Sequence, residues 1–182
     1  MFSDIRKKKI KRLFDAYDAN GNGFLDMNDL IVLTQRFSKE FGWRKGSPSE
    51  NRFKSVFFKI WSKLFREADL NHDHKVSFDE FSTYYERITS SEQSFFINLK
   101  PYMDELFLAL DSNQDYLLDK TEFLSFFKAF SLEEQNAEEV FQSIDKNGDG
   151  KISHLEFYVS FYEFHMSENP KLESRNLFGV LC

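Results

Sequence analysis

The sequence is poor in the residues that cross-link a chain or anchor it to a membrane. Its single cysteine, Cys182, excludes an intrachain disulfide. No stretch approaches the roughly 18 apolar residues of a membrane-spanning helix, and no apolar segment follows the early charges as it does in a secretory signal peptide. The second residue, Phe2, is not the glycine that myristoylation requires. We therefore expect no membrane span and a cytoplasmic location.

Histidine, methionine and tryptophan are also scarce. The four histidines show no Cys/His spacing typical of zinc and no nucleophile–base pair is suggested, so we expect no enzymatic activity. The formal net charge is −6, although residues 1–90 hold 17 Lys and Arg against 13 Asp and Glu. We interpret the basic run at 6–12 as the solvated face of a helix, and expect neither a nucleic-acid partner nor an anionic membrane.

The acidic residues, by contrast, follow a twelve-residue pattern that is complete at 145–156. Oxygen-bearing side chains recur at alternate positions, and Gly150 at the sixth position permits a sharp turn with φ > 0. Calcium takes six to eight oxygen ligands from loops of this kind. The predicted ligands are Asp145, Asn147, Asp149, Lys151 through its backbone carbonyl, Ser153, often through water, and Glu156 through both carboxylate oxygens.

The same pattern recurs three more times, which predicts up to four calcium sites. The first copy contains Asp18, Asn20, Asn22, Phe24, Asp26 and Asp29. The second copy contains Asp69, Asn71, Asp73, Lys75, Ser77 and Glu80. The third copy contains Asp111, Asn113, Asp115, Leu117, Asp119 and Glu122.

Apolar residues flank every loop at offsets of three, one and three, which puts one apolar stripe on a helix. Ser131 and Glu134 have the spacing of a capping box and predict the start of the helix before the fourth loop. The eighth residue of each loop is apolar and is expected to join a short two-stranded contact between paired loops. The sequence thus predicts an all-α fold of four helix–loop–helix units in two pairs, which form either one compact body or two small lobes.

The positions of the loops predict how these units are distributed. An N-terminal pair should occupy residues 1–90, a C-terminal pair residues 91–165, and a docking tail residues 166–182. The first two loops lie further apart than the last two, so the first pair carries an insertion. It contains a turn-rich segment at 41–49 and should continue as a long helix from about 50 to 68.

These loops are EF-hand motifs, and the whole chain resembles the sarcoplasmic calcium-binding proteins and their bacterial relative calerythrin. The resemblance rests on four such loops in about 180 residues, the long first insertion, and a closing Asn169-Pro170 followed by Asn-Leu-Phe-Gly at 176–179. It implies that both halves pack together and that the protein is a cytosolic calcium and magnesium buffer. Members often have disabled loops, whereas every loop here keeps its first-position Asp and its twelfth-position acid.

The four sites are not expected to be equal. Asp29 is shorter than the usual Glu, so the first loop should discriminate less against magnesium, which prefers shorter distances and one oxygen per carboxylate. His74 and Tyr116 occupy the sixth position of their loops, where a non-glycine residue with φ > 0 costs about 1–2 kcal/mol. We expect the fourth loop to bind most tightly, then the first and second, and the third most weakly.

Three functions fit this sequence, and calcium buffering by a monomer is favoured. The alternative is a calcium sensor that opens to bind a target protein. Sensors expose Met-rich grooves, whereas the four methionines here do not cluster. The third is a ligand-binding or light-emitting relative of the coelenterazine photoproteins, which is disfavoured because the only tryptophans, Trp43 and Trp61, both lie in the first half.

Overall fold

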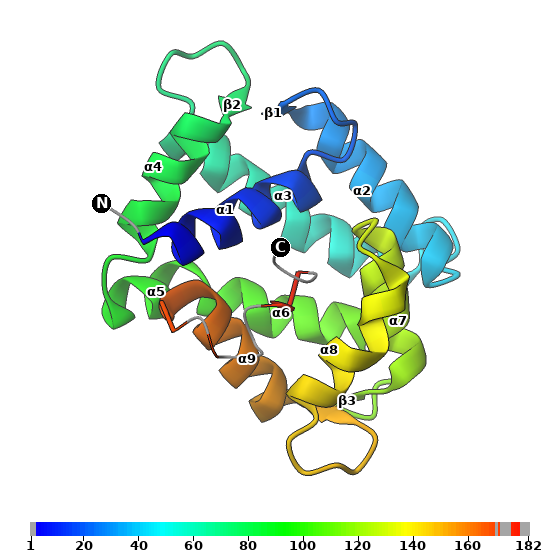
Figure 1. The fold of residues 1–182 in the computed structure, drawn as a ribbon. Helices are drawn as coiled ribbons and strands as arrows, with labels where there is room; N and C mark the ends of the chain where they lie inside the picture. Colours follow the sequence, from blue (N-terminus) through cyan, green and yellow to red (C-terminus); the bar gives the residue numbers. More distant parts are fainter. Residues whose placement is uncertain (1–2, 170, 172–175, 179–182) are drawn as a thin grey trace.

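The computed structural model describes residues 3–169, 171 and 176–178, and over these residues the chain is mainly helical (Figure 1). The first half contains α1 (Asp4–Tyr17), β1 (Phe24–Leu25), α2 (Met27–Glu40), α3 (Pro48–Ala68), β2 (Val76–Ser77), α4 (Phe78–Ile88) and α5 (Glu92–Asn98). The second half contains α6 (Lys100–Leu110), β3 (Leu117–Leu118), α7 (Lys120–Ala129), the short 3₁₀ helix η1 (Glu134–Asn136), α8 (Ala137–Ile144), β4 (Ile152–Ser153) and α9 (His154–Met166).

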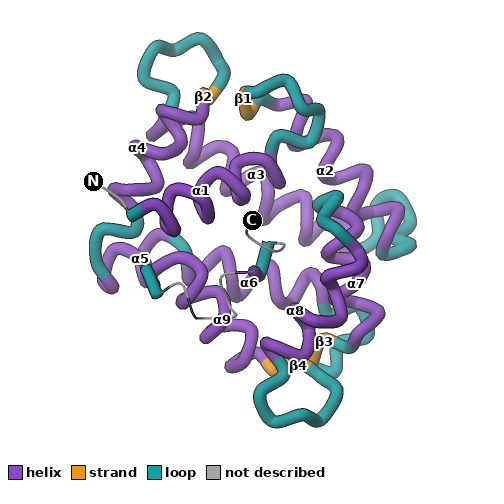
Figure 2. Tube along the Cα trace, viewed as in Figure 1, coloured by secondary structure: helices purple, strands orange, loops and turns teal. Residues whose placement is uncertain are grey.

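Each pair of loops is joined by a two-stranded antiparallel contact. Leu25 lies opposite Val76 in the first pair, and Leu118 lies opposite Ile152 in the second. All four side chains are fully buried, so each contact fixes the register of two loops with an apolar residue. The two contacts lie at opposite ends of the molecule (Figures 1 and 2). The predicted role of the eighth loop residue is confirmed.

The two halves pack on each other along their helices. Helix α2 lies against α7, and α3 lies against α6. Phenylalanine rings fill this interface: Phe130 from the second half makes an edge contact with Phe37 from the first, with ring centroids 5.1 Å apart. Trp61 is fully buried beside them, and its indole nitrogen donates to the carbonyl of Asp26 at 3.0 Å. The apolar stripes thus meet in one core, which confirms the all-α fold with both pairs in one body.

Polar contacts join α1 to the C-terminus of α9 and to the segment 176–178. The ammonium of the buried Lys9 donates to the carbonyls of Glu163 and Ser167 at 3.2 and 3.0 Å, which lie at the C-terminus of α9. Arg12 donates through Nε to the carbonyl of Phe178 at 2.8 Å. The carbonyl of Glu163 also accepts from the N–H of Ser167. The basic run at 6–12 is therefore not only a solvated face, as expected, because two of its cations bind carbonyls of the C-terminal segment.

Residues 176–178 of the tail lie in the core. Leu177 and Phe178 are buried, and the ring of Phe178 contacts those of Phe126, Phe130 and Phe164. Residues 170, 172–175 and 179–182 of the predicted tail, including Cys182, lie outside the described residues. Within the described residues, no helix is both long enough and apolar enough to cross a membrane.

Two local features differ from the sequence-based expectation. The capping box predicted at Ser131 and Glu134 is wrong, because Ser131 has φ 54° and its N–H donates to the carbonyl of Lys128, which ends α7 instead. Helix α8 begins only at Ala137, after η1. The second difference is α5, a short helix between the halves that was not predicted; it starts where the hydroxyl of Ser91 accepts from the N–H of Ser94.

Candidate metal centres

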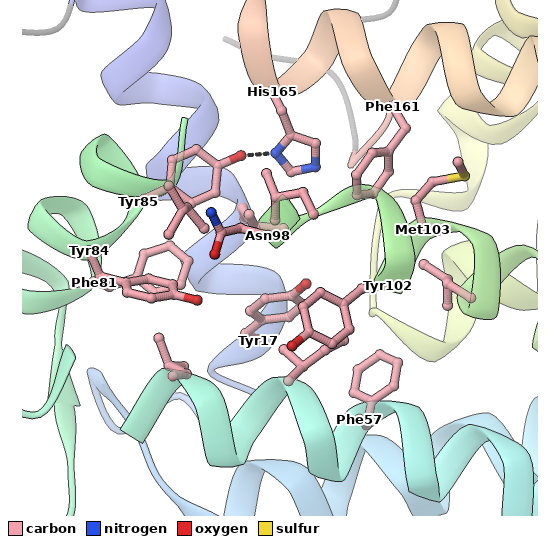
Figure 3. Close-up of a pocket in the computed structure, with 16 residues that line it drawn as sticks. Tyr17, Phe57, Phe81, Tyr84, Tyr85, Asn98, Tyr102, Met103, Phe161 and His165 are labelled. Atoms are coloured by element: carbon pink, nitrogen blue, oxygen red, sulfur yellow. Dashed lines mark hydrogen bonds between the residues drawn. The ribbon is translucent and has the colours of Figure 1, made fainter. Parts of the chain in front are cut away.

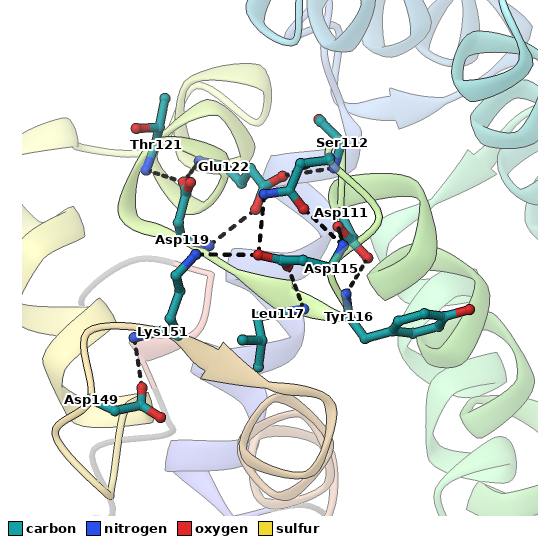
Figure 4. Close-up of polar contacts among 11 residues, drawn as sticks. Asp111, Ser112, Asp115, Tyr116, Leu117, Asp119, Thr121, Glu122, Asp149 and Lys151 are labelled. Carbon is teal, nitrogen blue, oxygen red and sulfur yellow. Dashed lines mark hydrogen bonds and ion pairs between the residues drawn. The ribbon is translucent and has the colours of Figure 1, made fainter.

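The acidic loops are organised around the aspartate at their first position, as the third loop shows (Figure 4). The carboxylate of Asp111 accepts from the N–H groups of Asp115 at 3.1 Å and Tyr116 at 2.9 Å. The side chain of Asn113 accepts from the Asp115 N–H at 2.8 Å, and Asp115 accepts from the Leu117 N–H at 2.9 Å. Oxygens from the first, third and fifth positions therefore all face the inside of one turn.

The other three loops repeat these bonds. The first-position residues Asp18, Asp69 and Asp145 accept from the N–H of the sixth residue at 2.8, 3.1 and 2.9 Å. The third-position residues Asn20, Asn71 and Asn147 accept from the N–H of the fifth at 3.0, 2.9 and 2.8 Å. The fifth-position residues Asn22, Asp73 and Asp149 accept from the N–H of Phe24, Lys75 and Lys151 at 2.8, 2.9 and 2.9 Å. The four loops thus have the same internal geometry.

The twelfth residue closes each loop by bonding to both of its ends. In the fourth loop, Glu156 accepts from the N–H of Lys146 at 3.0 Å and from the N–H of Ser153 at 2.8 Å. Ser153 is also the N-cap of α9, and its hydroxyl accepts from the N–H of Glu156. This capping box recurs at the ninth and twelfth residues of every loop, which are Asp26 and Asp29, Ser77 and Glu80, Asp119 and Glu122, and Ser153 and Glu156.

The aspartate of the first loop closes it differently. Asp29 accepts from the N–H of the third residue, Asn20, at 3.1 Å and from the N–H of Asp26 at 2.8 Å. Glu80 and Glu122 accept from the N–H of the second residue of their loops, at 3.2 and 2.7 Å, and Glu122 also accepts from that of the third, Asn113, at 3.4 Å. The side chain of Asp29 is fully buried, so its shorter reach leaves the carboxylate deeper than in the other loops.

The pKa values of these closing acids divide into two groups. Burial raises the pKa of Asp29 and of Glu122 above the usual range for a carboxyl. Burial also acts on Glu80 and Glu156, but the hydrogen bonds from their serine N-caps and loop amides lower the pKa of both overall. Since a metal ligand must be ionised, Glu80 and Glu156 hold the carboxylate form more firmly at low pH.

The donor set consists of hard oxygens, which suit calcium or magnesium and not softer metals. Within the described parts of the chain, no three His, Cys, Asp or Glu side chains lie close enough to hold a metal on their own. Each loop has at least three carboxylates together with Asn amides and backbone carbonyls, and these carboxylates accept N–H groups of the loop. The fit to a divalent ion therefore depends on the whole loop and not on an acidic cluster.

A second feature is an apolar cavity between the halves, which the sequence did not reveal (Figure 3). Its volume, measured as the space open to the centre of a water molecule, is about 60 Å³. Rings and aliphatic side chains from α1, α3, α4, α6 and α9 line it, with Asn98 at the end of α5. Trp43 and Trp61 are not among the lining residues.

Buried polar groups stand on one wall of this cavity. The hydroxyl of Tyr85 bonds to Nδ1 of His165, and the other ring nitrogen of His165 has no hydrogen-bond partner among the described residues (Figure 3). Burial is the main cause that lowers the pKa of His165 far below its usual value, and the nearby charges of Lys9 and Arg6 act in the same direction. His165 is thus a neutral imidazole with one unused polar atom at a cavity.

Comparison with known proteins gives the loops a family. Residues 7–86 and 101–164 match the sequence model of the EF-hand domain pair, and these ranges contain all four loops. The chain belongs to the EF-hand family. Its relatives in that family are calcium-binding proteins, so calcium binding is the property that the membership supports.

The relatives confirm the resemblance to sarcoplasmic calcium-binding proteins. Calerythrin from Saccharopolyspora erythraea is 27% identical over 167 residues, covering 91% of this chain and 94% of that protein. Sarcoplasmic calcium-binding proteins II, V, VI and VII from Branchiostoma lanceolatum are 29% identical over 184 residues, covering 96% and 95%. The structure of the coelenterazine-binding protein from Renilla muelleri, in its calcium-loaded apo form, superimposes with a TM-score of 0.78 at 18% identity, covering 99% of this chain and all of that one.

The EF-hand loops differ in how much backbone strain they carry. The sixth residue has φ > 0 in each loop, as predicted for His74 (64°) and Tyr116 (62°). The fourth residue also has φ > 0, which was not predicted; it is glycine in the first and fourth loops but His72 and Gln114 in the second and third. The second and third loops therefore hold two strained residues each. The sequence signal for the second left-handed residue was the glycine that the first and fourth loops have at both positions.

We expect Tyr116→Gly to tighten calcium binding at the third loop by up to about tenfold, because it removes a left-handed conformation that costs an L-residue about 1–2 kcal/mol. Calorimetric titration of the variant and the parent protein measures this. Tyr116→Asn should give an intermediate gain, since Asn tolerates φ > 0 better than Tyr. An unchanged or weaker affinity in Tyr116→Gly would show that strain does not limit this loop.

We expect stability to fall as the pH drops below about 6.5, because His165 binds a proton in the unfolded chain and resists it when folded. The free energy of unfolding should therefore be lower at pH 5.5 than at pH 7.5. Urea unfolding at both pH values should show a smaller loss in His165→Gln than in the parent protein. The matched control is His72→Gln, at an exposed position. If the loss of stability between the two pH values were as small in His72→Gln as in His165→Gln, the assignment to His165 would be contradicted.

Proposed function

We propose that this protein is a cytosolic calcium buffer in which all four EF-hand loops bind calcium and magnesium competes. The observation that carries the proposal is the shared loop geometry, in which an acid at the first position and an acid at the twelfth hold every loop in the same turn. The metal ligands of each loop are the residues at its first, third, fifth, seventh, ninth and twelfth positions. The fourth loop binds most tightly, because both of its φ > 0 residues are glycines and it closes with Glu156.

A closed core supports buffering over sensing. A sensor must expose an apolar groove when it binds calcium. Here the apolar faces of both pairs pack against each other, and Phe178 adds a further ring between α7 and α9. Opening either pair would expose these rings to water at about 1.5–3 kcal/mol for each side chain. The sensor alternative therefore requires a target that replaces an extensive aromatic interface.

A calorimetric calcium titration with about millimolar magnesium present tests the proposal. Affinities in the roughly nanomolar range that magnesium weakens mark a buffer, whereas micromolar sites that magnesium does not affect mark a sensor.

The variant Asp29→Glu supplies an internal control for the first loop. We expect it to reduce the competition by magnesium at that loop only, because the longer side chain can give both oxygens to calcium. Equal competition in Asp29→Glu and the parent would overturn the role of Asp29.

A second candidate function is the binding of a small apolar molecule in the central cavity. The observation that favours it is the unpartnered nitrogen of His165, since a buried polar group without a hydrogen bond costs about 1–3 kcal/mol. A ligand oxygen placed there would remove this cost, while rings such as Phe57 and Phe161 contact its apolar part. The fold is shared with a coelenterazine-binding protein, which suggests a probe.

Coelenterazine can serve as that probe, with its absorbance and fluorescence followed on titration with protein. We expect binding that His165→Gln weakens and that the exposed control His72→Gln leaves unchanged. Light on adding calcium would indicate a photoprotein, contrary to the expectation from the two tryptophans, which do not line the cavity. No binding, or binding that ignores His165, would contradict this second candidate.

A further inference from the structure

The third and fourth loops are joined by an ion pair across their two-stranded contact. The ammonium of Lys151 lies 3.3 Å from a carboxylate oxygen of Asp115 (Figure 4). Lys151 is the seventh residue of the fourth loop and Asp115 is the fifth residue of the third. The antiparallel pairing of β3 with β4 brings these positions together, since Lys151 comes directly before β4 and Asp115 shortly before β3.

This ion pair uses an oxygen that the third loop needs for a metal. The Oδ1 atom of Asp115 already accepts from the N–H of Leu117 at 2.9 Å, and Oδ2 accepts from the amide of Asn113 at 3.3 Å as well as from Lys151. A cation bound through Asp115 would face the ammonium at short range. The bound cation must either displace the ammonium of Lys151 or bind more weakly because the two positive charges repel each other.

We propose that Lys151 is a built-in competing cation that weakens calcium binding at the third loop and so makes the fourth loop fill first. The inference rests on the proposed function, because it assigns Asp115 as a calcium ligand. The competition is moderate, since the side chains of Lys151 and Asp115 are 36% and 39% exposed and water screens their charges.

The interaction acts in one direction only. The seventh residue of the third loop is Leu117, which carries no charge that could reach the fourth loop. Asp149, which corresponds to Asp115 in the fourth loop, accepts from the backbone N–H of Lys151 at 2.9 Å and from the amide of Asn147 at 3.0 Å. The charge of Lys151 therefore weakens calcium binding at the third loop only, and that loop already carries two strained residues.

The first pair of loops provides a natural control. Lys75 occupies the same position in the second loop as Lys151 does in the fourth. Its ammonium lies over the ring of Phe24, 5.3 Å from the centroid, and the fifth residue of the first loop is the neutral Asn22. The same lysine thus has no carboxylate partner at the corresponding place, so its removal should not tighten the first loop.

The test uses Lys151→Met, which keeps the length of the side chain and the backbone carbonyl but removes the charge. Two amides report on the two loops separately, because the N–H of Tyr116 donates to Asp111 and that of Gly150 donates to Asp145. Both can be followed by ¹H–¹⁵N NMR in chelator-buffered calcium. We expect the calcium concentration at the midpoint of the Tyr116 titration to fall about threefold in Lys151→Met. The midpoint for Gly150 should stay the same.

Two further variants separate charge from packing. Lys151→Arg should keep the parent midpoint for Tyr116, since it retains the cation, and Lys75→Met should leave the midpoint for Gly23 in the first loop unchanged. An equal midpoint for Tyr116 in Lys151→Met and the parent overturns this inference alone. A Tyr116 amide that does not respond to calcium in the parent overturns the third site itself, and with it the proposed function of that loop.

Discussion

The aspartate at the first position of each loop is the group on which the rest of this structure depends. One carboxylate gathers the N–H groups of the fifth and sixth residues, and this forces the chain to turn before the exit helix starts. The turn places the eighth residue at the two-stranded contact and the ninth at a helix N-cap. Because these steps follow from one side chain, the pattern can repeat four times with different neighbouring residues and still give the same loop.

The loops and the core are linked by the helices that leave them. The capping box at Asp26 and Asp29 starts α2, and the indole of Trp61 on α3 donates to the carbonyl of Asp26. Helix α2 in turn packs on α7, whose own start is the capping box at Asp119 and Glu122. These contacts connect the loops to the aromatic interface that joins the two halves in one body.

Much of the fold could be predicted because it rests on local spacing. The alternate oxygens, the apolar eighth residue and the helical stripes are all visible within twelve residues of one another. What could not be predicted depends on groups far apart in sequence or on backbone conformation. The left-handed conformations of His72 and Gln114, the end of α7 at Ser131, the cavity beside His165 and the contact of Lys151 with Asp115 belong to this class. The spacing of Ser131 and Glu134 was misleading because the same residue types also occur in the turn that ends a helix.

The contacts of Lys9 and Arg12 have a consequence for how the protein is made. Helix α1 is synthesised before the second half of the chain, yet the carbonyls that its two cations bind belong to Glu163, Ser167 and Phe178. A buried ammonium without these partners would be costly, so α1 cannot take its native place while the second half is still being synthesised. The first two loops can form early, but α1 takes its native place only after residues 163–178 have been synthesised. The helix that enters the first loop is thus completed by partners that lie more than 150 residues further along the chain.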